Sequence, residues 1–309
     1  MKHTVKKLFP GFTGKSITFT IDDGNTVYDK KFIDIVKPCG LKGTFNLCSH
    51  NISAMKPEEY RTFYQGFEIS NHCKYHPYAF DDSKTYEKST EKFSAETSDT
   101  RYIYESDVEG LYHFKAPQGW RLVADNHSYV NFARESRREL EEIFGKGSVT
   151  GFVWPFCRQN NREVFEALKN DGYYGLRTTG DRADLNNFAV PKDRMNWSYN
   201  ASDRSLLRIA EVYEKAENTG ELQMFCFGVH SIDFERNGTW SDLEAFAEKF
   251  GNSPDKYWYA TVGEIFGYQD AADSCITEDS CVKNRSDRTL YLDIDGKKVK
   301  LNSGESIFL

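Results

Sequence analysis

The sequence predicts an α/β fold built on a parallel sheet, and three observations point to it. Segments with the period of a strand alternate with segments with the period of a helix, and short links join them. Residues 222–229 (LQMFCFGV) are continuously apolar, as in a strand buried on both faces. Aspartate or histidine stands directly after several predicted strands, at the edge where parallel sheets place their sites.

The first strong element is residues 16–24 (SITFTIDDG), where apolar residues alternate with threonines and then stop in Asp22, Asp23 and Gly24. This alternation predicts a strand with one apolar face. Neighbouring side chains on a strand point to opposite faces, so both carboxylates reach one site only where the strand is already turning. Gly24 permits such a turn. Taken alone, the pattern also fits a strand followed by an Asp-Gly turn on the surface.

The remaining elements continue the alternation along the chain. Apolar periodicity and end signals predict further strands at residues 43–47, 66–70, 149–154, 173–177, 222–229 and 256–261. They predict helices at residues 28–37, 56–64, 126–144, 161–170, 205–217, 241–250 and 262–272.

Two segments depart from this rhythm. Residues 78–125 are polar and lack a sustained period, which indicates an insertion, either a wall over the site or a surface decoration. From residue 282 onward, alternating apolar residues flank Asp295-Gly296, which predicts an antiparallel hairpin with a further short strand at 307–309. We therefore expect a domain at 1–274 containing the insertion, and a small β appendage at 282–309.

The composition limits which binding partners and which cellular compartment are expected. The net charge of −7 and the pI of about 5.6 argue against a nucleic-acid surface. No apolar run has the length of a transmembrane helix, and no signal peptide is visible, so a cytoplasmic protein or a secreted one without its leader both fit. Cys275 and Cys281 could pair in an oxidising compartment.

The residues that carry chemistry stand at the ends of predicted strands. Asp22 and Asp23 follow the first of these strands, and His72 and His76 follow the strand at 66–70. Histidines four apart face the same way on a helical turn. Two imidazoles and a carboxylate suit a borderline ion such as Zn²⁺ and leave coordination positions open for water, as in a catalytic site. Pro155-Phe156 and His230 also follow predicted strands.

At these motifs the chain resembles the polysaccharide deacetylase family, that is, the NodB-homology domain of carbohydrate esterase family 4. TIDDG is similar to the family's TFDDG, GFEISNHCKYHP to GHEIGNHTxxHP, and FGVH to LxIH. FVWPFCRQNN with the helix after it is similar to the third motif. The motifs occur in the family's order over residues 15–270, apart from the insertion. The resemblance implies a distorted (β/α) barrel with fewer than eight regular strands.

The resemblance also implies roles for individual residues. Asp23, His72 and His76 fall on the family's metal ligands, and one divalent ion is expected, Zn²⁺ or alternatively Co²⁺ or Ni²⁺. Asp22 falls on the general base and His230 on the general acid. The backbone N–H of Phe156 falls on the oxyanion donor.

Departures from the family pattern concern the residue that orients the general base and the residues that contact the substrate. The arginine that orients the base is Val153 here, and Arg177 is the better of two replacements, the other being Arg158. The acidic-Trp fourth motif has no clear counterpart, although Trp197 lies in that region. Expected substrate contacts are Pro155, Phe227, Trp197, Tyr78 and Trp120.

The sequence therefore predicts a metal-dependent hydrolase that removes acetyl groups from an N- or O-acetylated oligo- or polysaccharide. A non-catalytic carbohydrate-binding protein on the same scaffold is the alternative, because the third and fourth motifs are altered. An amidase for a small acetylated molecule is a third reading. The sugar, the acetyl linkage and the oligomeric state stay open.

Overall fold

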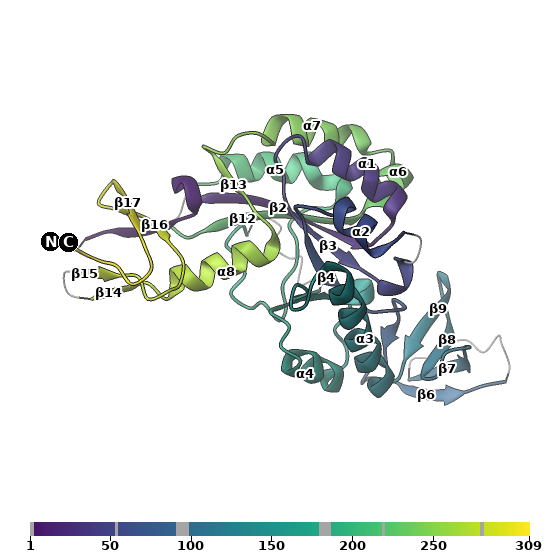
Figure 1. Cartoon of the computed structure of the whole chain (residues 1–309). Coiled ribbons are helices and arrows are strands. Elements are labelled where there is room, and N and C mark those ends of the chain that lie inside the picture. The colour runs from purple at the N-terminus through teal and green to yellow at the C-terminus, as the bar shows by residue number, and fades with distance from the viewer. Residues whose placement is uncertain (1–2, 53–54, 91–98, 179–186, 218–219, 279–280) are drawn as a thin grey trace.

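A seven-stranded parallel sheet forms the centre of the chain in the computed structural model, which describes residues 3–52, 55–90, 99–178, 187–217, 220–278 and 281–309 (Figure 1). The sheet order is β11-β10-β4-β3-β2-β12, and β13 pairs with the first three residues of β2. Its strands are β2 (Lys15–Asp23), β3 (Thr44–Leu47), β4 (Glu68–Asn71), β10 (Gly151–Val153), β11 (Gly175–Arg177), β12 (Gln223–His230) and β13 (Tyr257–Tyr259).

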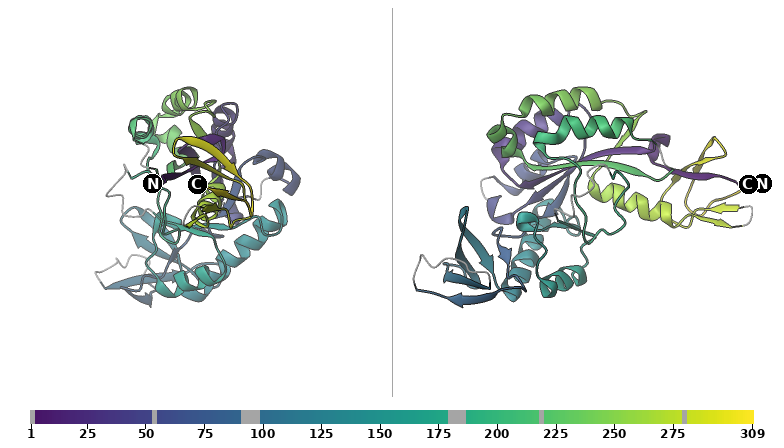
Figure 2. Two further views of the ribbon diagram at one scale, coloured as in Figure 1. Left: turned by 90° about the vertical axis from the view of Figure 1, so that its left-hand side faces the viewer. Right: turned by 180° about the vertical axis from the view of Figure 1, so that it is seen from behind.

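The sheet curls into a partial barrel with helices packed around its outside (Figures 1 and 2). This confirms the predicted fold class. The helices are α1 (Thr26–Val36), α2 (Pro57–Phe63), α3 (Asn126–Phe144), α4 (Arg162–Asn170), α5 (Leu206–Lys215), α6 (Ser231–Asn237), α7 (Trp240–Phe250) and α8 (Val262–Asp273). Helix α6 was not predicted, because seven residues with few buried side chains give no readable helical period.

The two faces of β2 show why the sheet curls around a polar interior. Ile17, Phe19 and Ile21 enter the main hydrophobic core beneath the helices. Thr20 lies on the inner face, where it accepts a hydrogen bond from Asn46 Nδ2 at 2.6 Å. The predicted alternation of this strand therefore separates an apolar outside from a polar inside.

The insertion forms a separate five-stranded sheet at the side of the barrel, in the order β5-β9-β8-β7-β6 (Figure 1). Its small core is Ile103, Phe114, Ala116 and Val123. The strands are β5 (Tyr78–Ala79), β6 (Thr85–Lys88), β7 (Thr100–Glu105), β8 (Leu111–Ala116) and β9 (Gly119–Ala124).

The C-terminal strands, together with the N-terminal strand β1, form two three-stranded sheets at the other end of the molecule (Figures 1 and 2). The expected hairpin is present, with Asp295 and Gly296 both at positive φ in its turn. The last strand pairs with β15 and not with the hairpin, while β1 (Val5–Leu8) takes the free edge of β16. The strands here are β14 (Ile276–Glu278), β15 (Cys281–Lys283), β16 (Leu290–Ile294), β17 (Lys297–Leu301) and β18 (Ser306–Phe308).

Two further expectations can be compared with the structure. Within the described residues, no helix combines the length and the apolarity needed to cross a membrane. The thiols of Cys275 and Cys281 are both free. The division into a domain at 1–274 and an appendage at 282–309 stays a prediction, although β1 belongs to the same sheet as the C-terminal hairpin.

One buried carboxyl group ties three helical segments together. Asp29 of α1 is fully buried and accepts hydrogen bonds from Tyr64 Oη at 2.7 Å and from Ser231 Oγ at 2.6 Å. Burial raises the pKa of Asp29 to about 7, although both hydrogen bonds oppose that shift. The folded protein therefore holds a proton on Asp29 at pH values where the unfolded chain has lost it.

This predicts a specific pH dependence of stability. Because the pKa of Asp29 is higher in the folded state, its contribution is fully present below about pH 4 and is lost as the pH rises through 7. Asp29→Asn cannot ionise, so its free energy of unfolding relative to wild type should rise by on the order of 3 kcal/mol from pH 4 to pH 8. Urea unfolding of the metal-free protein measures this. Asp34→Asn, on an exposed turn of the same helix, is the control. Parallel pH profiles for wild type and Asp29→Asn would contradict the prediction.

Candidate metal centre and active site

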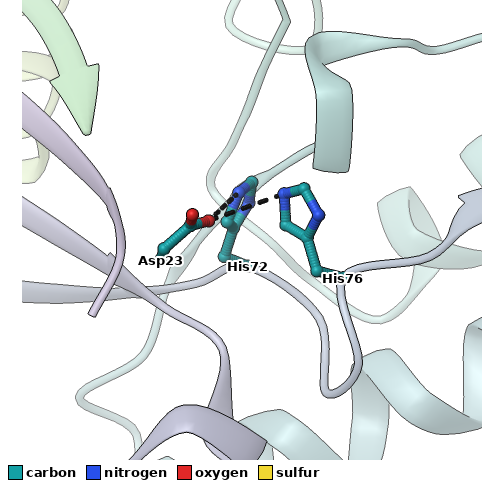
Figure 3. Close-up of side chains that lie close together, drawn as sticks. All are labelled: Asp23, His72 and His76. Carbon is teal, nitrogen blue, oxygen red and sulfur yellow. Dashed lines mark ion pairs between the residues drawn. The ribbon is translucent and has the colours of Figure 1, made fainter. Parts of the chain in front are cut away.

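Three side chains meet at the carboxyl ends of β2 and β4 (Figure 3). Asp23 Oδ1 lies 3.5 Å from both His72 Nε2 and His76 Nε2. The ligand atoms of all three residues lie within 4.8 Å of one another. The two imidazole rings are in edge contact, with centroids 4.7 Å apart. The structure therefore brings together the three residues that the motifs selected.

The hydrogen bonds around these three side chains leave atoms free that could bind a cation. His72 Nδ1 lies 2.8 Å from the carbonyl oxygen of Val153, which can only accept, so Nδ1 carries the proton. This leaves a lone pair on Nε2 that faces Asp23 Oδ1. That oxygen is buried, and nothing in the described part of the chain hydrogen-bonds to it. An acceptor nitrogen facing an orphaned carboxylate oxygen is the arrangement that a bound divalent ion satisfies.

The second histidine is also prepared as a ligand. Burial lowers the pKa of His76 to about 4, and the nearby His72 acts in the same direction. His76 is therefore neutral near pH 7, with a lone pair available for a metal.

Left-handed backbone concentrates at this site. In the described residues eight non-glycine positions have positive φ, and five of them adjoin the site: Asp23, Cys73, His76, Phe156 and Cys157. Such conformations are costly and persist where surrounding contacts impose them. The expected helical turn from His72 to His76 is wrong, because positive φ at Cys73 and His76 makes this segment a loop. Asn71 braces the loop by accepting from the Cys73 N–H at 2.9 Å.

Asp22 points into the barrel and is held by two partners. Arg177 Nη2 donates to both carboxylate oxygens at 2.5 Å, and Asn46 Nδ2 donates to Oδ1 at 2.7 Å. Burial raises the pKa of Asp22, but the charges of Arg177, His72 and His230 and the hydrogen bond from Arg177 together outweigh burial and hold the pKa below its usual range. The expected contact between Arg177 and Asp22 is thus present. Asn46 was missed, since an Asn within a buried strand gives no sign of its partner.

His230 stands beside Asp22 because β12 pairs with β2 in a register that aligns the two residues. Its Nε2 lies 3.8 Å from Asp23 Oδ2, and its Nδ1 lies 2.8 Å from Asp233 Oδ2. Burial alone would lower the pKa of His230, but its hydrogen bond to Asp233 and the charges of the nearby aspartates raise the pKa to about 9. Asp233 was also missed. Its spacing of three from His230 is that of a capping box, which starts α6.

These residues share a pocket of about 440 Å³, a volume suited to a small ligand or part of a longer one. Its lining includes Asp22, Asp23, His72, His76, Arg121, Phe156, Cys157, Tyr199, Ser202, Asp203, Gly228, His230, Asp233 and Arg236. Tyr78 supports one wall by stacking on Phe156, with ring centroids 3.8 Å apart. Pro155 precedes Phe156 and is buried.

Three expected substrate contacts lie elsewhere. Phe227 is fully buried in the outer core, because alternation along β12 sends it toward the helices and leaves Gly228 at the pocket. Trp197 is buried against Phe266 of α8, and Tyr199, two residues later, lines the pocket.

Trp120 is 41% exposed and packs on Tyr104, while its neighbour Arg121 lines the pocket. A residue of the insertion therefore forms part of the wall, but it is not the expected one.

The sequence model of the polysaccharide deacetylase family matches residues 11–176, more than half of the chain. A putative polysaccharide deacetylase from Mycobacterium smegmatis is similar in structure, with a TM-score of 0.54 and 15% identity over 88% of this chain and 96% of that chain. At this identity the likeness shows the fold. No curated protein sequence matches the chain.

Two other solved structures are more distant. A family 4 carbohydrate esterase from Streptococcus mutans has a TM-score of 0.48 and 15% identity, over 80% of this chain and 86% of that chain. The Xyl-CE4 domain of a multidomain xylanase from the hindgut metagenome of Trinervitermes trinervoides has a TM-score of 0.47 and 15% identity, over 86% of this chain and 92% of that chain.

The buried pair of Arg177 and Asp22 predicts a large effect on stability. Arg177→Met should lower the free energy of unfolding by about 3–5 kcal/mol, because it leaves Asp22 buried without its main counter-charge. The double variant Asp22→Asn/Arg177→Met should recover much of this loss, since both charges are then absent. Urea unfolding of metal-free protein measures both. Arg134→Met, which breaks the more exposed pair with Asp171, should cost no more than about 1 kcal/mol. If Arg177→Met and the double variant lose the same free energy of unfolding, the unpaired charge of Asp22 is not the cause of the loss.

Proposed function

This chain belongs to the polysaccharide deacetylase family, and we propose that it is a metal-dependent hydrolase that removes acetyl groups from an N- or O-acetylated carbohydrate. The observation that carries the proposal is the orphaned oxygen of Asp23, which faces two histidine nitrogens between an ionised Asp22 and a protonated His230. Removal of an acetyl group from nitrogen or oxygen needs a base for water, stabilisation of an oxyanion and an acid for the leaving atom. This arrangement offers each of them.

Asp23, His72 and His76 would hold the metal. Two nitrogens and one oxygen are a donor set of borderline softness, which suits Zn²⁺ and also accepts Co²⁺ or Ni²⁺. A divalent ion at this place supplies Lewis acidity, which polarises an acetyl carbonyl and acidifies water. Asp23 and His72 stand at strand ends, so the sheet sets their spacing, and the loop that Asn71 braces places His76.

Asp22 is the general base in this proposal. Arg177 and Asn46 occupy its carboxylate oxygens from inside the barrel, which orients the group and keeps it ionised at neutral pH. An ionised carboxylate can take the proton that an attacking water loses.

His230 is the general acid in this proposal. With a pKa raised to about 9, it carries a proton at neutral pH and can donate it from Nε2 to the departing nitrogen or oxygen. Asp233 holds Nδ1, so it fixes the ring and stabilises the charged form. The Phe156 N–H, positioned by a left-handed backbone, is the proposed donor to the oxyanion.

The two adjacent aspartates separate metal binding from proton transfer. Asp23→Asn should reduce metal content, because an amide is a poorer partner for a dication than a carboxylate. Asp22→Asn should keep the metal but lower turnover by about 10²–10⁴-fold, the usual worth of a placed proton acceptor. Metal analysis and acetate release from a panel of acetylated glycans measure both effects. Equal loss of metal in both variants would refute these roles. A wild type that binds metal and glycan but releases no acetate would refute hydrolysis.

The contact between Asp233 and His230 predicts a change in the pH profile. A general acid works below its pKa, so turnover should fall as the pH rises through the pKa of His230. Asp233→Asn removes the charge that stabilises protonated His230, so the alkaline limb of kcat should move to lower pH by about one unit or more. Glu235→Gln, on the same helix but bonded to Trp240, should leave the limb in place. An unmoved limb in Asp233→Asn would show that Asp233 does not tune the acid.

A further inference from the structure

The insertion places a positive charge in the wall of the pocket. Along β9, Arg121 lies opposite Phe114 and Trp120 lies opposite Lys115, so alternation sends the two neighbours to different faces. Trp120 packs on Tyr104, whereas Arg121 lines the same pocket as Asp23 and His76. The register of this hairpin therefore selects Arg121 as the side chain that the insertion offers to a ligand.

Arg121 keeps most of its hydrogen-bonding capacity unused. Its Nη1 donates to the main-chain carbonyl of Trp120 at 2.9 Å, and across the described ranges no carboxylate forms an ion pair with it. A guanidinium has five N–H donors in a planar fork that matches a carboxylate or a phosphate. A partly buried arginine with unused donors can bind an anionic group of the ligand.

The acidic residues of the pocket already have partners. Asp22 is neutralised by Arg177, and Asp233 contacts both His230 and Arg236. Asp203 accepts hydrogen bonds from Asn237 Nδ2 at 2.7 Å and Thr239 Oγ1 at 3.0 Å. In the described part of the chain none of these carboxylates pairs with Arg121, so its guanidinium is available to a ligand.

The positive charge of Arg121 contrasts with the negative net charge of the whole molecule. The chain carries a net charge of −7, which repels anions from most of its surface. Arg121 and Arg236 both line the pocket, and a bound divalent ion adds further positive charge there. Arg236 contacts Asp233, so Arg121 is the arginine of this lining that no aspartate pairs with in the described residues, and it can bind a negative group of the ligand.

We infer that Arg121 is a specificity-determining residue that binds a carboxylate or phosphate carried by the acetylated sugar, so that the substrate is an anionic glycan. This inference rests on the function proposed above for the same pocket. Arg121 takes no part in proton transfer and acts by binding the charged group, so its effect belongs in affinity and KM more than in kcat.

The test uses the full-length, Zn²⁺-loaded chain and three acetylated ligands of matched length. One is a neutral N-acetylglucosamine oligomer, one alternates N-acetylglucosamine with glucuronic acid, and one carries phosphate groups. Calorimetric titration should show at least about tenfold tighter binding of a charged ligand than of the neutral one, with the preference falling at higher salt. Preference for the glucuronic acid ligand identifies a carboxylate, and preference for the phosphorylated ligand identifies a phosphate.

Arg121→Gln should abolish this preference, and Arg121→Lys should retain part of it. Lys115→Gln is the matched control, because it removes one positive charge from the neighbouring strand on the opposite face of the insertion sheet. The control should keep the preference. A wild type that binds charged and neutral ligands equally would overturn the inference. An Arg121→Gln variant that keeps the preference would also overturn it, because the metal or another cation would then bind the anionic group.

Acetate release from the same three ligands tests the hydrolase separately. If binding depends on the ligand charge through Arg121 but no acetate is released, the inference is supported and the proposed hydrolase activity is refuted. Equal kcat/KM values for the charged and the neutral ligands would keep the hydrolase and overturn the inference.

Discussion

The ion pair between Arg177 and Asp22 is the contact on which the rest of this structure depends. In the sheet order, three strands separate β11 from β2. With about 4.8 Å between neighbouring strands, a flat sheet would keep these residues some 19 Å apart, beyond the reach of one side chain. They meet only because the sheet curls and Arg177 crosses the inside of the barrel. The same curl brings the strand ends that carry Asp23, His72 and His230 around one pocket.

Much of the fold and of the candidate site could be predicted, because the informative residues lie on long or punctuated strands. The alternation in residues 16–24 and the apolar run at 222–229 identified the two strands that share the longest register. Histidine and aspartate at strand ends gave the metal-binding group. Arg177 could be selected because it ends a strand on the same edge of the sheet. In each case the position on a strand determined where the side chain points.

The parts that could not be predicted depend on contacts that are remote in sequence or on irregular backbone. Asn46 contacts Asp22 only because β3 and β2 are in register, and a single strand carries no sign of its register. The histidine loop contains two left-handed residues other than glycine, which local preferences disfavour. Phe227 was assigned to the pocket by its motif, although strand alternation directs it to the core. The choice of Arg121 over Trp120 likewise depends on the register of a hairpin inside an irregular insertion.

The pairing of β1 with β16 has a consequence for how the chain acquires its structure. Val5 is aligned with Ile294, so β1 finds its partner only after residue 294 has been synthesised. The pairs that build the candidate site, Asp22 with Arg177 and Asp22 with His230, lie between these two strands and are separated by fewer residues. Because long loops lose more entropy on closure and slow the formation of their contacts, the barrel should fold on the ribosome before the terminal sheet. During that interval β1 lacks its partner strand β16, so its backbone N–H and C=O groups stay open to pairing with another strand.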